Sequence, residues 1–178
     1  MSSIVVLVGN PQPASRTRLV AEELARQLAA RGGAEVEVEA TIDLADVAGS
    51  LFRFPDLVVD ALLERVARAD VLVVASPTYK ATYTGLLKAF LDRYGSHGLA
   101  GVTAVPLLTI GGPGHALAVE HGLRPLLVEL GASTPTRGLA FPAGETERRE
   151  EIVSAFLETE WSRLAPALGA PAEPVRAG

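Results

Sequence analysis

The chain contains no cysteine, and this absence removes several chemistries at once. A disulfide framework, thiolate metal ligation, an iron–sulfur cluster and a cysteine nucleophile all need that side chain. Aromatic residues make up only 5% of the 178 residues, so we expect an aliphatic core. No run of about 18 apolar residues occurs, and no membrane-spanning helix is expected. Any redox chemistry therefore has to come from a bound group.

A strong charge of one sign is also missing. The formal net charge is -5, and the Lys and Arg side chains are scattered along the chain, so nucleic acid is not an expected partner. No basic segment precedes the first apolar stretch, and we expect a cytoplasmic protein without membrane contact. A hydrophobic content of 48% with 21% charged residues is typical of a globular chain.

Short apolar runs alternate with amphipathic stretches along the sequence. The expected strands are 4–8, 34–42, 71–75, 102–110 and about 136–141, and the expected helices are 17–31, 56–69, 85–94, 117–130 and 146–164. Strict alternation predicts a parallel, doubly wound α/β sheet. The second strand alternates apolar residues with Glu35, Glu37 and Glu39, which indicates an edge strand. We therefore predict a flavodoxin-like, three-layered fold with a five-stranded sheet of order 2-1-3-4-5.

One domain accounts for the chain, since domains of about 100 to 200 residues are the usual unit. We place this domain at residues 1–164. Residues 165–178 are rich in Ala, Pro and Gly and show no periodicity, which predicts a flexible C-terminal tail.

The loop after the first strand is the first candidate for ligand binding, because open α/β sheets bind ligands beyond the carboxyl ends of their strands. It reads Gly9-Asn-Pro-Gln-Pro-Ala-Ser-Arg-Thr17 and lacks both GxGxxG and GxxxxGK. Ser15 and Thr17 offer hydroxyl groups beside the free N–H groups of a first helical turn, and Arg16 adds a positive charge. The loop suits a phosphate monoester. A plain N-cap at Ser15 with a solvated Arg16 explains the same residues equally well.

The loop after the third strand spans 76–85 and is longer than the two to six residues usual for this connection. Pro77 stiffens its backbone, and the N–H groups that follow are free to face the edge of a planar ligand. Tyr79 could lie against a ring. The alternative is an ordinary loop in which Thr84 caps the next helix.

The loop after the fourth strand contains Gly111, Gly112 and Gly114. Glycine allows a ligand to approach the backbone closely, although the same residues also suit a tight turn. His115 follows at the start of the next helix. No cluster of His and carboxylate residues has metal-ligand spacing, and the GxSxG nucleophile motif is absent, so we expect neither a metal nor a nucleophilic triad.

Together these loops resemble the NADPH-dependent FMN reductase family of flavodoxin-like proteins, from about Ile4 to Phe141. The segment Ser76-Pro-Thr-Tyr-Lys-Ala-Thr-Tyr-Thr-Gly-Leu-Leu-Lys-Ala-Phe-Leu-Asp92 is similar to the family signature SPxYxxSxxGxLKxxLD. The segment Gly111-Gly112 followed by His115-Ala-Leu-Ala-Val-Glu-His-Gly-Leu-Arg-Pro125 resembles one branch, which supplies reduced flavin to two-component monooxygenases, such as those that desulfonate alkanesulfonates. The resemblance implies an NAD(P)H:FMN oxidoreductase that uses FMN with NADPH or NADH.

The resemblance also implies where FMN is bound. The expected cofactor-binding residues are Gly9, Asn10, Pro11, Gln12, Ser15, Arg16, Thr17, Pro77, Thr78, Tyr79, Lys80, Gly111, Gly112 and His115, the first loop around the phosphate and the others around the isoalloxazine ring. The family pattern GSxRxxS is altered here, because Asn10 replaces Ser and Gln12 stands where Arg is usual. One cationic contact is lost, with Arg16 as a possible substitute, and a weaker phosphate grip suits a flavin that leaves. We expect no catalytic side chain, since the flavin itself carries the hydride chemistry.

The same branch implies a homo-oligomer, dimer or tetramer, and a flavin-dependent monooxygenase as partner. Its helix after the Gly-Gly loop lies at a tetramer interface and can carry an inserted aromatic residue as a π-bulge. His121 stands where some relatives have Tyr. A π-bulge here is a hypothesis that a regular α-helical ladder through Val119 to Arg124 would refute, and an ordinary interface histidine is the alternative.

Three other functions remain open on the sequence alone. A relative that retains FMN could reduce quinones, azo dyes or metal oxyanions. An electron carrier of the flavodoxin kind would bind FMN without reacting with NAD(P)H, although such carriers rely on a more acidic surface than a net charge of -5 provides. A flavin-free interaction module would not need the small and polar residues of the three loops.

Overall fold

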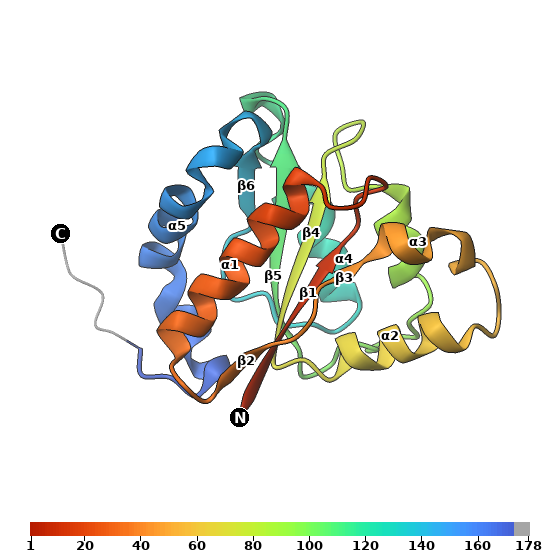
Figure 1. Ribbon diagram of the computed structural model, residues 1–178, viewed down its shortest axis with the longest axis horizontal. Coiled ribbons are helices and arrows are strands. Elements are labelled where there is room, and N and C mark those ends of the chain that lie inside the picture. Colours follow the sequence, from red (N-terminus) through yellow and green to blue (C-terminus); the bar gives the residue numbers. More distant parts are fainter. Residues whose placement is uncertain (173–178) are drawn as a thin grey trace.

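A parallel β-sheet lies between two layers of helices in the computed structural model, which describes residues 1–172 (Figure 1). The strands are β1 (Ser2–Val8), β2 (Val36–Val38), β3 (Ile42–Asp43), β4 (Val71–Pro77), β5 (Thr103–Ile110) and β6 (Leu139–Pro142). The α-helices are α1 (Arg16–Gly32), α2 (Leu57–Ala67), α3 (Gly85–Leu91), α4 (Arg124–Glu129) and α5 (Arg149–Leu164). The sheet order is β2-β1-β4-β5-β6, with β3 also paired to β1. The predicted 2-1-3-4-5 arrangement and three-layered fold are confirmed.

The strand β1, which lies next to the central strand β4, shows why the sheet is covered on both faces. Ile4, Val6 and Val8 pack in one apolar cluster with α1 and α5. Val5 and Leu7 point to the opposite face and pack with α2, α3 and α4. Successive side chains of a strand alternate between faces, so a continuous apolar run needs a helical layer on each side.

The predicted second strand is interrupted in the structure. Residues 34–42 were expected to form one strand, but β2 ends at Val38 and β3 begins at Ile42. Between them, Arg65 of α2 pairs with Glu39 and donates to the Ala40 carbonyl, and the Thr41 hydroxyl donates to Glu22 of α1. Arg65 thus occupies one backbone carbonyl, that of Ala40, between the two strand pieces. Both pieces still pair with β1, so the sheet has six strands in the predicted order.

The stretch predicted as a tail begins with regular structure. The helix α5 ends at Leu164 as expected, but a 3-10 helix, Ala165–Leu168, follows directly. Ala165 and Leu168 are buried in the cluster formed with α1 and α5. Of the predicted tail, residues 173–178 lie outside the described part of the chain. Within the described part, no helix is long and apolar enough to cross a membrane.

Gly9 offers a direct test of how tightly the loop after β1 packs. A Cβ atom at Gly9 would lie 2.5 Å from Leu87 Cβ on α3, too close for any side chain. Gly9→Ala should therefore lower the free energy of unfolding by about 1–3 kcal/mol, measured by urea denaturation. Gly49→Ala is the control, because a Cβ there meets nothing within 4 Å. Equal effects of both substitutions would contradict this packing.

Candidate active site

The three loops predicted from the sequence meet at the carboxyl edge of the sheet. The backbone N–H of Gly9 donates to the Ala75 carbonyl at 2.8 Å, which joins the first loop to β4. The N–H of Thr78 donates to the Thr109 carbonyl, also at 2.8 Å, which joins the second loop to β5. Parallel pairing of β1, β4 and β5 brings these strand ends together.

In the first loop, Asn10 points inward. It is 7% exposed, its Oδ1 accepts the Gln12 N–H at 2.9 Å, and its Nδ2 donates to Thr17 Oγ1 at 3.2 Å. The amide thus holds the loop in shape from within. Gln12 itself, with Pro11, is exposed at the surface of the loop.

Ser15 and Arg16 open helix α1. Ser15 Oγ accepts the Arg18 N–H at 3.2 Å, which is an N-cap, and the residue is 8% exposed. The N–H groups of the first helical turn have no partner within the helix, and the helix dipole favours an anion in front of them. Arg16 is exposed and donates to the Ala143 carbonyl at 3.2 Å. The cap and the anion site are thus compatible features of one helix start.

Asp43 supports this loop and was missed in the sequence analysis. Its side chain is 1% exposed, and Oδ2 accepts the Ala14 N–H at 3.3 Å and lies 3.6 Å from Arg18 Nη1. Ala14 has a φ of 50°, in the left-handed region. The available signal was an acidic residue just beyond an edge strand that lies next to β1, at the edge where ligands bind.

The second loop forms a tight hairpin at its tip. Tyr79 and Thr82 exchange backbone hydrogen bonds of 2.9 and 3.3 Å, and Lys80 and Ala81 between them have φ values of 52° and 68°. Positive φ at both central residues is the signature of a type I′ turn, which usually contains Gly or Asn. Tyr79, 48% exposed, is the most accessible aromatic residue of the three loops.

Two buried hydroxyl groups fix the base of this hairpin. Thr84 Oγ1 donates to the Gly9 carbonyl at 2.5 Å and accepts the Leu87 N–H at 3.2 Å, so it caps α3 and ties two loops together. Ser76 Oγ accepts the Thr84 N–H at 3.0 Å. The capping role considered for Thr84 is present, and it serves the site as well.

One polar atom beside the hairpin has no partner among the described residues. Thr78 Oγ1 is buried and makes no hydrogen bond there. A buried hydroxyl without a partner is costly unless a ligand or solvent supplies one. Together with the free N–H groups at the start of α1, this atom fits a ligand that carries a phosphate and a polar ring, as FMN does.

The third loop remains open. Gly111 and His115 are exposed, Gly112 is partly exposed, and a Cβ atom added to either glycine would meet nothing within 4 Å. His115 ends a short 3-10 helix, Pro113–His115. The glycines therefore leave open space at the carboxyl end of β5. Among the described residues, no group of three or more His, Cys, Asp or Glu side chains could hold a metal ion.

The helix expected at 117–130 begins with a π-helical turn, Val119–Leu123, before α4. The N–H of Arg124 donates to the Val119 carbonyl, which is the wider π pattern. The hypothesis of a π-bulge around His121 is confirmed, and the His121 side chain is exposed.

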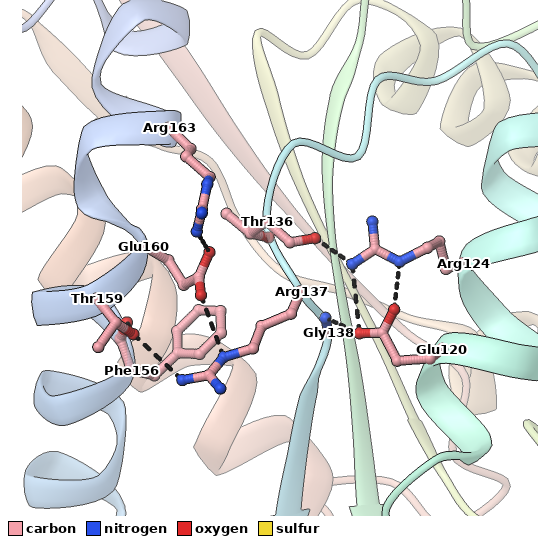
Figure 2. Close-up of polar contacts among 9 residues, drawn as sticks. All are labelled: Glu120, Arg124, Thr136, Arg137, Gly138, Phe156, Thr159, Glu160 and Arg163. Carbon is pink, nitrogen blue, oxygen red and sulfur yellow. Dashed lines mark hydrogen bonds and ion pairs between the residues drawn. The ribbon is translucent and has the colours of Figure 1, made fainter.

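A clamp of Glu120 and Arg124 holds this turn against the segment before β6 (Figure 2). Arg124 Nε donates to Glu120 Oε2 at 2.5 Å, and its Nη atoms donate to the Thr134 and Thr136 carbonyls. Glu120 Oε1 accepts the Gly138 N–H at 2.5 Å. Burial raises the pKa of Glu120, but the hydrogen bonds from Arg124 and Gly138 outweigh it and hold that pKa below its usual value.

A surface hollow of about 330 Å³ lies away from the three loops, between β6 and α5. Its lining includes Arg137, Leu139, Ala155 and Phe156. Arg137 is paired with Glu160, which also binds Arg163 (Figure 2). The remaining lining is largely apolar, so this hollow offers little to a phosphate or to a polar ring.

The hairpin tip predicts a stabilising substitution. An L-residue in the left-handed region is strained by roughly 1–2 kcal/mol, and glycine is not. Ala81→Gly should therefore raise the free energy of unfolding by up to about 1 kcal/mol, measured by urea denaturation. The exposed Ala116, with a φ of -59°, is the matched control, and Ala116→Gly should lower stability. A loss of stability at both positions would contradict the hairpin geometry.

The clamp predicts a pH-dependent loss of stability. Glu120→Gln removes the charged partner of Arg124 and should cost about 1–2 kcal/mol at pH 7. The pKa of Glu120 is lower in the folded than in the unfolded chain, so its stabilisation is complete above the unfolded value and is lost as the pH falls through the folded one. The difference between wild type and variant should therefore shrink below about pH 4.5, the ordinary glutamate value. Urea denaturation from pH 7 to about pH 3 measures it, with Glu129→Gln at an exposed position as the control. A difference independent of pH would argue against this role.

Comparison with known proteins identifies the family of this chain. The chain matches the NADPH-dependent FMN reductase family over residues 2–146. It is 34% identical over 178 residues to "FMN reductase (NADPH)" of Escherichia coli K12, covering 90% of this chain and 89% of that one. It is 36% identical over 141 residues to "NADH-dependent FMN reductase SfnF" of Pseudomonas putida, covering 76% and 75%.

A solved structure shows the same fold. The apo form of the NADH:FMN oxidoreductase EmoB superposes with a TM-score of 0.77 at 30% identity, covering 98% of this chain and 92% of that one. The family resemblance drawn from the sequence, and with it the assignment as an NAD(P)H:FMN oxidoreductase, is confirmed. The chain belongs to the NADPH-dependent FMN reductase family.

Proposed function

We propose that this protein binds FMN across the three loops at the carboxyl edge of the sheet, reduces it with NADPH or NADH and releases the reduced flavin to a partner monooxygenase. The observation that carries this proposal is the meeting of the three loops at one edge of the sheet, beside the start of α1 and the Thr78 hydroxyl, which has no partner among the described residues. The proposed binding residues are those predicted from the sequence, with the phosphate at the start of α1 and the ring between the second and third loops.

In this proposal the side chains of the protein bind and orient the flavin and do not themselves react. Bound FMN supplies the redox chemistry by accepting hydride from the nicotinamide. Ser15 and the first turn of α1 hold the phosphate, and Pro77–Lys80 with Gly111 and Gly112 border the ring. The N–H groups of Thr78 and Tyr79 donate to the Thr109 and Thr82 carbonyls, so within Pro77–Lys80 the Lys80 N–H is the group that would stabilise negative charge on the ring, as in an oxyanion hole.

Release of the flavin is supported by the modest charge around its phosphate. Gln12 stands where the family pattern has Arg, and Arg18 is engaged by Glu22 and Asp43. Arg16 is the remaining cation of the first helical turn. One relative is named for NADPH and another for NADH, so the nicotinamide preference of this chain has to be measured. We place the protein in the cytoplasm.

Association between copies is part of the proposal. The apolar stripes of the third and fourth predicted helices serve mainly the core, since Leu87, Phe90, Leu123 and Leu127 are fully buried. Leu117 and Val128 are the exceptions, with 64% and 53% of their surfaces exposed beside the π-helical turn and on α4. A dimer or tetramer formed through this face would cover them, as the family branch implies.

The test is anaerobic stopped-flow absorbance at the oxidised-flavin band, mixing the protein and stoichiometric FMN with NADPH or NADH. A filtration assay follows the flavin after reduction. We expect rapid bleaching, with flavin passing the filter. Bleaching with retained flavin would instead indicate a reductase of quinones, azo dyes or metal oxyanions, and FMN binding without bleaching would indicate an electron carrier.

A further inference from the structure

The π-helical turn Val119–Leu123 packs directly against the hairpin of the second loop. A Cβ atom added at Gly122, within this turn, would lie 2.7 Å from Thr82 Oγ1 and 3.8 Å from Thr82 Cβ. The shorter separation is too small for a real Cβ atom. Only glycine therefore lets the backbone of the turn come this near to the hairpin.

The turn is held firmly on its other sides. Val119 and Leu123 are buried in the core, and a Cβ atom added at Gly138 would overlap the Val119 side chain. The clamp of Glu120 and Arg124 ties the turn to the segment before β6 (Figure 2). A closely packed interior offers no space into which such a turn can retreat. Any pressure at the contact between Gly122 and the hairpin therefore falls on the hairpin.

The tip of the hairpin is free to yield to that pressure. Thr82 exchanges backbone hydrogen bonds of 2.9 and 3.3 Å with Tyr79, and Lys80 and Ala81 between them are exposed. Buried hydroxyl groups hold only the base of the hairpin, against the first loop and α3. A displacement of Thr82 therefore moves Tyr79 and Lys80 with it, because the paired residues of a hairpin shift together.

We propose that Gly122 is a positioning residue, which lets the π-helical turn support Thr82 and so sets where Tyr79 and Lys80 meet the flavin ring. This inference rests on the proposed function, in which the hairpin borders the ring. Gly122 acts through Thr82 and does not itself touch the flavin. The π-helical turn thus has a task within one copy of the chain, separate from any contact between copies.

The test adds one methyl group at this contact, in Gly122→Ala. Dissociation constants of FMN and riboflavin are measured on the full-length protein by flavin fluorescence, and the melting temperature of each flavin-free variant is recorded. Both flavins should bind about tenfold more weakly. The two losses should be equal, because both flavins carry the ring and only FMN carries the phosphate. Alanine favours a helix more than glycine does, so helix propensity does not predict this loss.

A second substitution makes room for the added methyl group. Thr82→Ala removes Oγ1 and keeps Cβ, which would lie 3.8 Å from the new atom, an ordinary contact. The double variant should therefore bind both flavins to within about threefold of the wild type, although Gly122→Ala alone does not. Thr82→Ala by itself should change either affinity by less than about threefold. A merely structural effect of Gly122→Ala on its own helix would not be relieved by a change in the hairpin.

Two further variants complete the comparison. Thr82→Ile enlarges the same contact from the hairpin side, and it should weaken both flavins by a similar factor. It replaces Gly122→Ala if that variant does not fold. Gly49→Ala is the matched control, because Gly49 also lies within a helix, Leu44–Ser50, and a Cβ atom there meets nothing within 4 Å. It should leave both affinities unchanged.

The outcomes separate this inference from the proposed function. A wild-type protein that binds neither flavin would overturn the proposed function, and this inference with it. A wild type that binds both, together with a Gly122→Ala variant of unchanged affinity, would overturn only the role of Gly122. A loss confined to FMN, or a loss that Thr82→Ala does not relieve, would also overturn that role.

Discussion

Parallel pairing of the central strands is the constraint on which the site depends. Val8 of β1 is in register with Ala75 of β4, and Pro77 of β4 is in register with Thr109 of β5. Because all three strands run in one direction, the loops that leave them emerge at one edge. Residues far apart in the sequence therefore meet at this edge, and the apolar strands that fix the fold also fix the position of the site.

The loops are held to one another by neutral groups. Thr84 bonds to the first loop, Thr17 bonds to Thr109, and Ser76 bonds within the second loop, all with little access to water. Buried hydrogen bonds of this kind keep their strength in salt, whereas exposed ion pairs such as that of Arg148 and Glu151 contribute little. Asp43 is the charged exception behind the first loop.

Local sequence signals located most of the fold and the three loops. Apolar runs gave the strands, and glycine and proline marked the connections. The interrupted second strand was not predictable in this way, because the residues at its break contact Arg65 and Glu22, which lie on two different helices. The supporting roles of Asp43 and Thr109 were missed for the same reason, since both arise from contacts between distant segments. The π-helical turn came from the family resemblance, because apolar spacing alone indicates only a helix.

The edges of the sheet have a consequence for behaviour at high protein concentration. β6 has four residues and ends in Pro142, which has no N–H to donate, and β2 has three residues with the charged Glu37 exposed at its centre. A strand from another molecule would find few groups to pair with at either margin. Polymerisation by continuing the sheet from molecule to molecule, the route to fibrils, is therefore disfavoured by the same short strands that complete the fold.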